Sequence, residues 1–171
     1  PETDSEGVIG VWNTATFNGT ATDALVYWVA GAQAAVAVNK SLTNSKYNGE
    51  RTVDTNYTQA DLEAAIKAGK FMLHSVNGTV RVLEDINTLV TLTAEKGEIF
   101  QSNQTVRVCD QIANDVAVLF NTRYVGIVPN DASGRATLWN DIVKLIQQLE
   151  TLRAVEDFDP DTVSVDIGDH K

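Results

Sequence analysis

The chain has 171 residues, of which 43% are hydrophobic and 21% are charged, a composition that is typical of a folded globular protein and excludes a disordered one. Its formal net charge of -10 and pI near 4.5 argue against nucleic-acid binding, which needs clustered Lys and Arg to displace phosphate counterions. The length predicts one domain that buries a core without a disulfide or a metal.

The first third of the chain is predicted to hold a strand, a turn and an apolar helix. Residues 7–17 alternate apolar and small polar side chains, which predicts a strand followed by a turn at Asn18 and Gly19. Thr22 or Asp23 can cap a helix over residues 24–38. This apolar run is shorter than the ~20 residues that span a bilayer, so we interpret it as a buried core helix and expect no membrane contact. Residues 39–57 are predicted to be a polar connection.

The next segment carries two strong local signals. Thr58 stands three residues before Asp61, a capping pattern, and Gly69 is a helix stop signal, so a short helix is expected between them. Asn77 and Gly78 then separate two alternating segments, which predicts a β-hairpin because both residues tolerate the positive φ of a type I′ turn.

The second half of the chain is predicted to form two long amphipathic helices and a final strand. Apolar residues recur at helical spacing over residues 106–124 and again over residues 132–153, and residues 162–167 alternate like a strand. The expected fold class is α+β, with a small mixed or antiparallel sheet that includes the hairpin, packed against several amphipathic helices. The expected core contains Trp28, Ile66, Val82, Cys109, Ile112, Val116, Phe120, Trp139, Ile142, Leu145 and Leu149.

Candidate catalytic residues are few. Asp110, Asn114 and Asp115 share a helix face and could pair as acid and base, but a helix surface offers no desolvated cleft to adjust their pKa, so polar contacts are favoured. His74 and His170 lie far apart in the sequence, with no nucleophile motif beside them. No phosphate loop, paired cysteines or zinc motif is present in the sequence, and neither an enzyme nor a cofactor is expected.

One acidic segment has calcium-loop spacing. Asp157, Asp159 and Asp161 alternate, but Thr162 replaces the turn glycine of an EF-hand and Gly168 occupies the position of its bidentate glutamate. We therefore reject an EF-hand and expect no metal centre, and a looser surface cation site stays as the alternative.

Several motifs together resemble the C-terminal part of contractile phage tail sheath proteins, especially those of prophages and phage-tail-like particles of Gram-positive bacteria. The most specific are "EDINTL" (residues 84–89), "RVCDQIAND" (residues 107–115), "GR" (residues 134–135) and "FDPDTVSV" (residues 158–165). Ala94 stands where such proteins often have Pro, and Cys109 where an aliphatic residue is usual. Both departures are compatible with packing roles.

This resemblance implies a structural subunit of a contractile sheath. Such a subunit polymerises around a tail tube and contracts to drive the tube through the host cell envelope. The implied partners are other sheath copies through strand exchange, the tube protein and the baseplate, with no nucleic acid and no membrane. The implied location is the virion tail or a phage-tail-like particle, assembled in the host cytoplasm. Residues 7–168 are expected to be the core domain of a longer protein whose final arm is missing, with tails at 1–6 and 169–171.

The sequence also suggests which residues meet partners. Arg135, Lys144 and Arg153 are expected to face acidic groups of the tube, while Asp110 and Asn114 are expected to be structural or interfacial. The alternative function is an acidic carbohydrate- or protein-binding module of a secreted or surface protein, suggested by acidity, polar loops and scattered aromatic residues. A small hydrolase that uses Asp110 or Asp115 is a third candidate.

Overall fold

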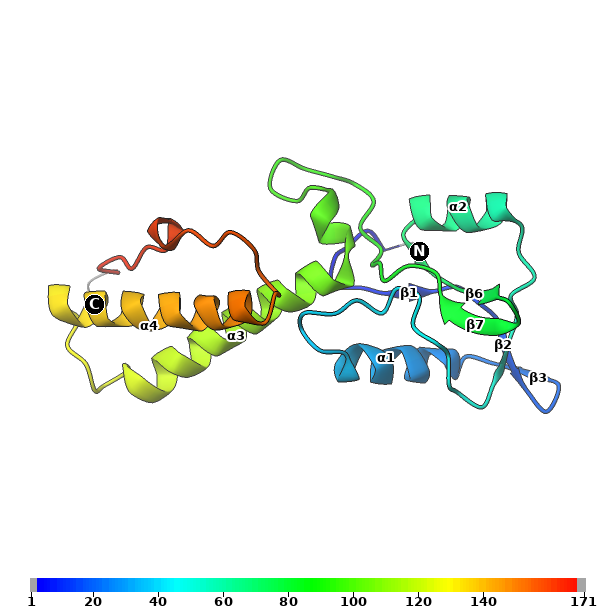
Figure 1. The fold of residues 1–171 in the computed structure, drawn as a ribbon, viewed down its shortest axis with the longest axis horizontal. Coiled ribbons are helices and arrows are strands. Elements are labelled where there is room, and N and C mark those ends of the chain that lie inside the picture. The colour runs from blue at the N-terminus through cyan, green and yellow to red at the C-terminus, as the bar shows by residue number, and fades with distance from the viewer. Residues whose placement is uncertain (1–2, 169–171) are drawn as a thin grey trace. The chain divides into compact units, whose positions relative to one another are not determined.

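A computed structural model of the chain describes residues 3–168. The tail residues 1–2 and 169–171, and with them His170, lie outside the described residues. The chain divides into two compact units, Pro1–Val106 and Arg107–Lys171, and their placement relative to one another is not determined. The α+β class expected from the sequence is confirmed (Figure 1).

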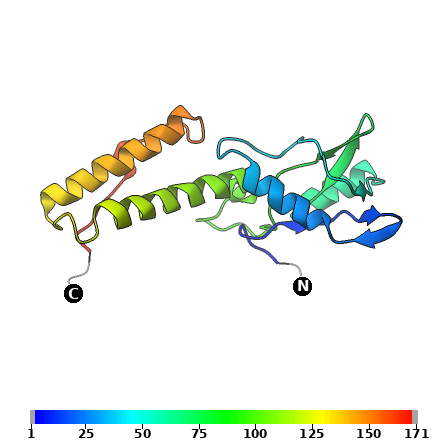
Figure 2. The same cartoon turned by 90° about the horizontal axis from the view of Figure 1, so that it is seen from below.

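The first unit places short strands between two helices. Figures 1 and 2 show α1 and α2 on opposite sides of the strands. Its elements are β1 (Gly10–Val11), β2 (Ala15–Phe17), β3 (Thr20–Thr22), α1 (Leu25–Ala35), β4 (Thr52–Val53), α2 (Gln59–Lys67), β5 (Lys70–Phe71), β6 (Leu73–Val76), β7 (Thr79–Val82) and a 3-10 turn at Glu98–Gln101.

The strand pairings explain why the single strand predicted over residues 7–17 is divided in two. β1 pairs in parallel with β5, whereas β2 pairs antiparallel with both β3 and β4. Between β1 and β2 the side chain of Asn13 replaces the backbone ladder, accepting from the Leu73 N–H at 2.7 Å and donating to the Leu73 carbonyl at 2.8 Å. The amide group thus occupies the place of a strand residue at the break.

Three local predictions are confirmed. Asn18 and Gly19 have positive φ and connect β2 to β3, and Asn77 and Gly78 do the same for β6 and β7, whose antiparallel register runs from Leu73 opposite Val82 to Val76 opposite Thr79. Thr58 and Asp61 form a reciprocal capping box at the start of α2. The hydrogen bond from the Thr58 hydroxyl lowers the pKa of Asp61 below its usual value.

The apolar helix differs from the prediction in length, cap and burial. It ends at Ala35, and its N-cap Ala24 makes no side-chain capping bond. The Thr22 hydroxyl accepts a hydrogen bond from the N–H of Ala24, the N-cap residue itself, so Thr22 is not the cap. The predicted burial is wrong, because Leu25 and Val29 alone are buried and the outer face is open to solvent.

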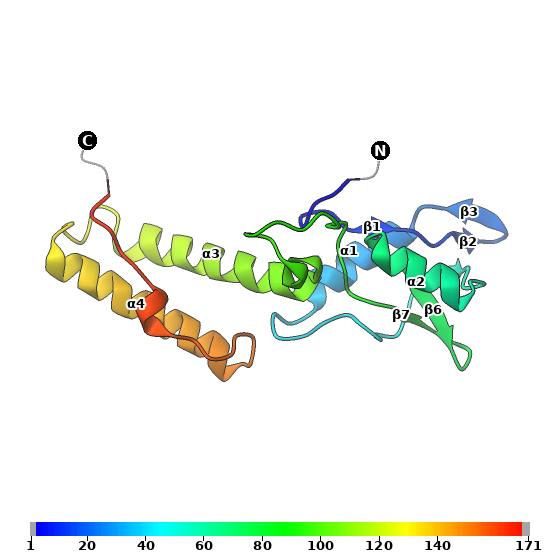
Figure 3. The same cartoon turned by 90° about the horizontal axis from the view of Figure 1, so that it is seen from above.

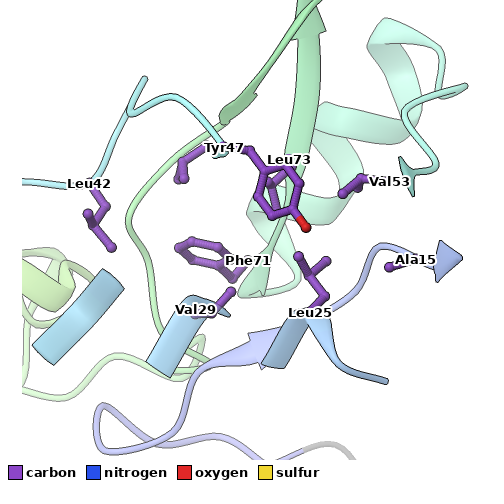
Figure 4. Packing of buried hydrophobic residues seen from close by; sticks show 9 residues of the cluster. Ala15, Leu25, Val29, Leu42, Tyr47, Val53, Phe71 and Leu73 are labelled. Carbon is purple, nitrogen blue, oxygen red and sulfur yellow. The ribbon is translucent and has the colours of Figure 1, made fainter. Parts of the chain in front are cut away.

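The main core lies in the first unit, under α1. Figure 4 shows Leu25 and Val29 pointing toward Phe71 and Leu73, with Tyr47 beside them. Phe71 and Leu73 have no exposed surface, so their burial contributes the most here. The full cluster is Ala15, Leu25, Val29, Leu42, Tyr47, Val53, Phe71, Leu73 and Val82.

The second unit is a pair of antiparallel helices covered by a returning segment. α3 (Asn103–Arg123) begins in the first unit and continues here, where α4 (Ala132–Thr151) runs beside it in the opposite direction (Figures 2 and 3). After a 3-10 turn at Pro160–Thr162, the chain returns over α4. The predicted strand over residues 162–167 is wrong, because Thr162 ends the 3-10 turn and residues 163–167 have no strand partner in the described part of the chain.

The predicted core was correct in part. Val82 and Leu149 are buried as expected. Cys109 is exposed and 45% of Phe120 is exposed, so both core assignments are wrong. An apolar stripe identifies the face that a helix buries when it is covered, but here Asn103 is the only buried residue of α3. The remaining members are half-buried: Trp28, Ile66, Ile112, Val116, Trp139, Ile142 and Leu145.

Candidate functional site

The carboxylates that could have formed a catalytic pair lie on an open helix surface. Asp110 and Asn114 are exposed on α3, and Asp115 is half-buried at the edge of a groove. An open helix surface neither encloses a substrate nor excludes water from these carboxylates. The geometry therefore favours polar contacts at these positions over the acid–base chemistry that a hydrolase would need.

The acidic loop near the end of the chain has a structural role. Asp159 caps the 3-10 turn at Pro160–Thr162, with its Oδ1 accepting from the Asp161 N–H at 3.0 Å. Within residues 3–168, no three His, Cys, Asp or Glu residues come together in a way that could hold a metal ion. In the same described range, no helix combines the length and the apolar character needed to cross a bilayer.

The three cations expected to face a partner do not share one surface of α4. Successive α-helical residues turn by about 100°, so Arg135 and Lys144 project from opposite sides. Arg135 donates to the Asn130 carbonyl at 3.1 Å, whereas the Lys144 side chain is 69% exposed and lies 3.8 Å from Asp141. Arg153 follows the helix at a positive φ and is exposed. Lys144 is therefore the cation on α4 most available to a partner.

A groove of about 450 Å³ separates α3 from α4 within the second unit. Asp115 and Val118 line its α3 side, and Asp141 and Lys144 line its α4 side. At one end the Tyr124 hydroxyl donates to Asp141 Oδ2 at 2.8 Å. Burial, followed by this hydrogen bond, raises the pKa of Tyr124 above its usual value. The groove mixes charged and apolar groups, as partner-facing surfaces commonly do.

A second and more apolar hollow, of about 640 Å³, lies where the α3–α4 connection meets the returning segment. Phe120, Val125 and Leu138 line one part of it, and Val165 and Ile167 line another. Asn130 Nδ2 donates to the Ile167 carbonyl at 2.8 Å and so connects the returning segment to the α3–α4 connection. Both of these hollows are open to the surface of the second unit.

The "GR" pair is explained by the turn before α4. Asp131 caps the helix by accepting from the Gly134 N–H at 2.7 Å. Gly134 is buried so closely against Pro129 that a Cβ at this position would overlap the Pro129 carbonyl oxygen. The Arg135 side chain stabilises the same turn by donating to the carbonyl and to Oδ1 of Asn130. Glycine is required here by close backbone approach.

The "EDINTL" segment is the polar centre of the first unit, a role that the sequence analysis missed. Asp85 is 2% exposed, and its carboxylate accepts from Gln33 Nε2 at 2.6 Å, from the Leu42 N–H at 2.9 Å and from Asn103 Nδ2 at 2.9 Å. The neighbouring Asn87 donates to the Phe100 carbonyl at 2.7 Å. An Asp and an Asn beside aliphatic residues were the only sequence signal of this network.

Comparison with known proteins shows which family the chain matches. The phage tail sheath protein central domain matches residues 2–88, and the phage tail sheath C-terminal domain matches residues 95–169. The tail sheath protein of Clostridium phage phiCD119 is 29% identical over 98% of this chain and 47% of its own length.

Two solved structures are similar in fold and in sequence. The sheath tail protein of Desulfitobacterium hafniense has a TM-score of 0.82 and 37% identity, covering 93% of this chain and 38% of that one. The sheath tail protein of Listeria innocua has a TM-score of 0.84 and 29% identity, covering 94% of this chain and 39% of that one.

The chain combines an α+β fold with a buried polar network and open surface grooves. This chain belongs to the phage tail sheath family. It spans less than half of the length of the relatives named above.

Proposed function

We propose that this chain is the core of a sheath subunit that polymerises around a tail tube and contracts to drive the tube through the host cell envelope. The observation that carries the proposal is the match of two consecutive sheath domains over residues 2–88 and 95–169. The boundaries 7–168 for a single core domain remain part of this proposal. Function in such a subunit would reside in its surfaces, with no enzymatic reaction and no cofactor.

The proposed partners are other sheath copies, the tail tube protein and the baseplate, without nucleic acid or membrane. Strand exchange between copies is supported by residues 163–168, which have no strand partner within the described part of the chain and are available to an added strand. Contraction would then be a rigid-body rearrangement of subunits that stay linked by the exchanged strands. The proposed location is the virion tail, or a phage-tail-like particle, after assembly in the host cytoplasm.

For the tube, we propose α4 as the contacting element, with Lys144 as the principal cation. Arg135, on the opposite side of the helix, and Arg153, after its end, would meet other acidic groups of the tube. Asp110 and Asn114 on α3 are proposed to contact neighbouring copies. Exposed charges on a partner-facing helix guide register more than they add affinity, so Lys144→Glu should reduce decoration of tubes by the sheath. Lys67→Glu on α2 is the matched control, because Lys67 is also an exposed helical lysine.

Electron microscopy of the full-length protein, co-expressed with its tube and baseplate proteins, tests the assignment. The expected particles are sleeves around tubes, in a long narrow form and a short wide form. A full-length protein that never polymerises in their presence would contradict the proposed function.

A further inference from the structure

The outer face of α1 is apolar and open to solvent. Of its side chains, 51% of Val26 and 80% of Tyr27 are exposed, and Ala30, Gly31 and Ala34 continue the same exposed surface. Val26, Ala30 and Ala34 are four residues apart along the helix, and so are Tyr27 and Gly31. These five residues, called the α1 outer face below, therefore lie on one side of the helix. Leu25 and Val29, in contrast, point into the core (Figure 4).

The α1 outer face is apolar, whereas the exposed surface of α2, the other helix placed beside the strands of this unit, is polar. The exposed residues of α2 include Gln59, Asp61, Glu63 and Lys67, the polar surface expected of a helix that faces water. No charged residue occurs anywhere in residues 24–38. A contiguous exposed apolar surface of this kind marks a site of contact with another molecule.

The charge of the chain indicates what can cover this face. With a formal net charge of -10, two copies that approach through most surfaces bring carboxylates together, which opposes contact. The α1 outer face is a surface where a second acidic copy can pack without that repulsion. Its small residues let another surface approach the helix closely, and Tyr27 supplies the exposed aromatic side chain that commonly anchors an interface.

We propose that the α1 outer face packs against a neighbouring copy of this chain in the assembled sheath. This inference rests on the proposed function, since the sheath is what brings copies together. A sleeve grows as an open helical polymer, which requires a surface on one copy to meet a different surface on the next. The α1 outer face is therefore one side of a head-to-tail contact, and its acceptor lies elsewhere on the neighbour.

A photocrosslinking amino acid at position 27 of the full-length protein tests this contact. Sheaths assembled from a mixture of ¹⁴N and ¹⁵N subunits are irradiated, and the crosslinked peptides are identified by mass spectrometry. The expected product joins position 27 to a second sheath subunit, recognised by mixed isotope labels. Crosslinks to the tube protein, to the same subunit only, or to nothing would overturn the inference. Absence of sleeves under all conditions would instead contradict the proposed function.

Charge substitution at the same residue separates assembly from folding. Tyr27→Glu places a carboxylate on the α1 outer face and should reduce the sleeve yield at least tenfold, whereas Tyr27→Phe should assemble normally. Gln59→Glu adds the same charge to the polar surface of α2 and serves as the control. All three variants should keep the melting temperature of the wild type, because both positions are exposed. Normal sleeves from Tyr27→Glu would overturn the inference.

Discussion

Asn103 Nδ2 donates to Asp85 Oδ1 at 2.9 Å, and the Asn103 N–H donates to the Asp85 carbonyl at 3.1 Å. The first residue of α3 is thereby fixed twice to the "EDINTL" segment, and both residues are buried. The same carboxylate also accepts from Gln33 of α1 and from the backbone of Leu42. Asp85 therefore joins three segments that are distant in the sequence.

Removing the Asp85 carboxylate should destabilise the first unit strongly. Asp85→Ala leaves the buried Leu42 N–H and one hydrogen of Asn103 Nδ2 without an acceptor, while Nδ2 still donates to the Ile86 carbonyl. Unsatisfied buried groups of this kind cost about 2–4 kcal/mol together. Urea unfolding followed by circular dichroism measures the loss. Asp110→Ala, at an exposed carboxylate of α3, is the control and should change the free energy of unfolding by less than about 0.5 kcal/mol. Equal effects at both positions would contradict the network.

Two phenylalanines should respond very differently to truncation. Phe71 is fully buried in the main core, so Phe71→Ala should cost about 3–5 kcal/mol by leaving a cavity. Phe120 is partly exposed and stacks on Tyr124 with ring centroids 6.4 Å apart, so Phe120→Ala should cost about 1 kcal/mol. Chemical denaturation of both variants measures the difference. A larger loss at Phe120 would mean that α3 is buried in solution.

Gly134 should not tolerate a side chain. Gly134→Ala forces a methyl group against the Pro129 carbonyl oxygen, and such overpacking costs about 1–3 kcal/mol even though alanine favours helices. The thermal unfolding midpoint should fall. Gly31→Ala in α1 is the matched control, because nothing lies near its Cβ position, and its midpoint should stay the same or rise. A stabilised Gly134→Ala variant would contradict the packing of this turn.

Stability should fall at alkaline pH through Tyr124. Its pKa in the folded chain is raised above 10.0, chiefly by burial and then by its hydrogen bond to Asp141, with Arg123 opposing weakly. The unfolded state therefore releases the proton first, so the stabilisation is complete below about pH 10 and is lost as the pH rises through the folded pKa. Unfolding measured from pH 8 to pH 11 should show this fall.

Tyr124→Phe is the control for the alkaline effect. It removes the ionisable hydroxyl, so the free energy of unfolding should decrease less steeply with rising pH. Part of the decrease should remain, because burial, followed by the charge of Asp54, also raises the pKa of Tyr57. An unchanged pH profile in this variant would show that Tyr124 does not titrate in this range.

Local signals could be predicted from the sequence, while the polar network and the exposed helix faces could not. The Thr58–Asp61 capping box and the Asn77–Gly78 turn depend on neighbours in the chain, so residue type was enough. The Asp85–Asn103 contact depends on tertiary packing. The exposure of Phe120 depends on what covers α3, which no periodicity specifies.

Residues 163–168 should behave as an unpaired segment until the sheath assembles. Two side-chain bonds hold their carbonyls, from Trp139 Nε1 to Val163 at 2.9 Å and from Asn130 Nδ2 to Ile167 at 2.8 Å. Within the described part of the chain, the N–H groups of residues 164–168 make no backbone hydrogen bond. Strand exchange would supply those bonds from a neighbouring copy.

Hydrogen exchange can detect the change. In the unassembled protein, the amides of residues 164–168 should exchange nearly as fast as those of an unfolded peptide. The Val82 amide, bonded to the Ser45 carbonyl at 2.9 Å in the core, should exchange slowly and serves as the internal reference. In assembled sheaths the amides of residues 164–168 should exchange as slowly as that of Val82. Backbone hydrogen bonds to a strand of another copy would occupy these N–H groups and shield them from water. Slow exchange before assembly would mean that the segment is already paired. Fast exchange after assembly would place strand exchange elsewhere on the subunit.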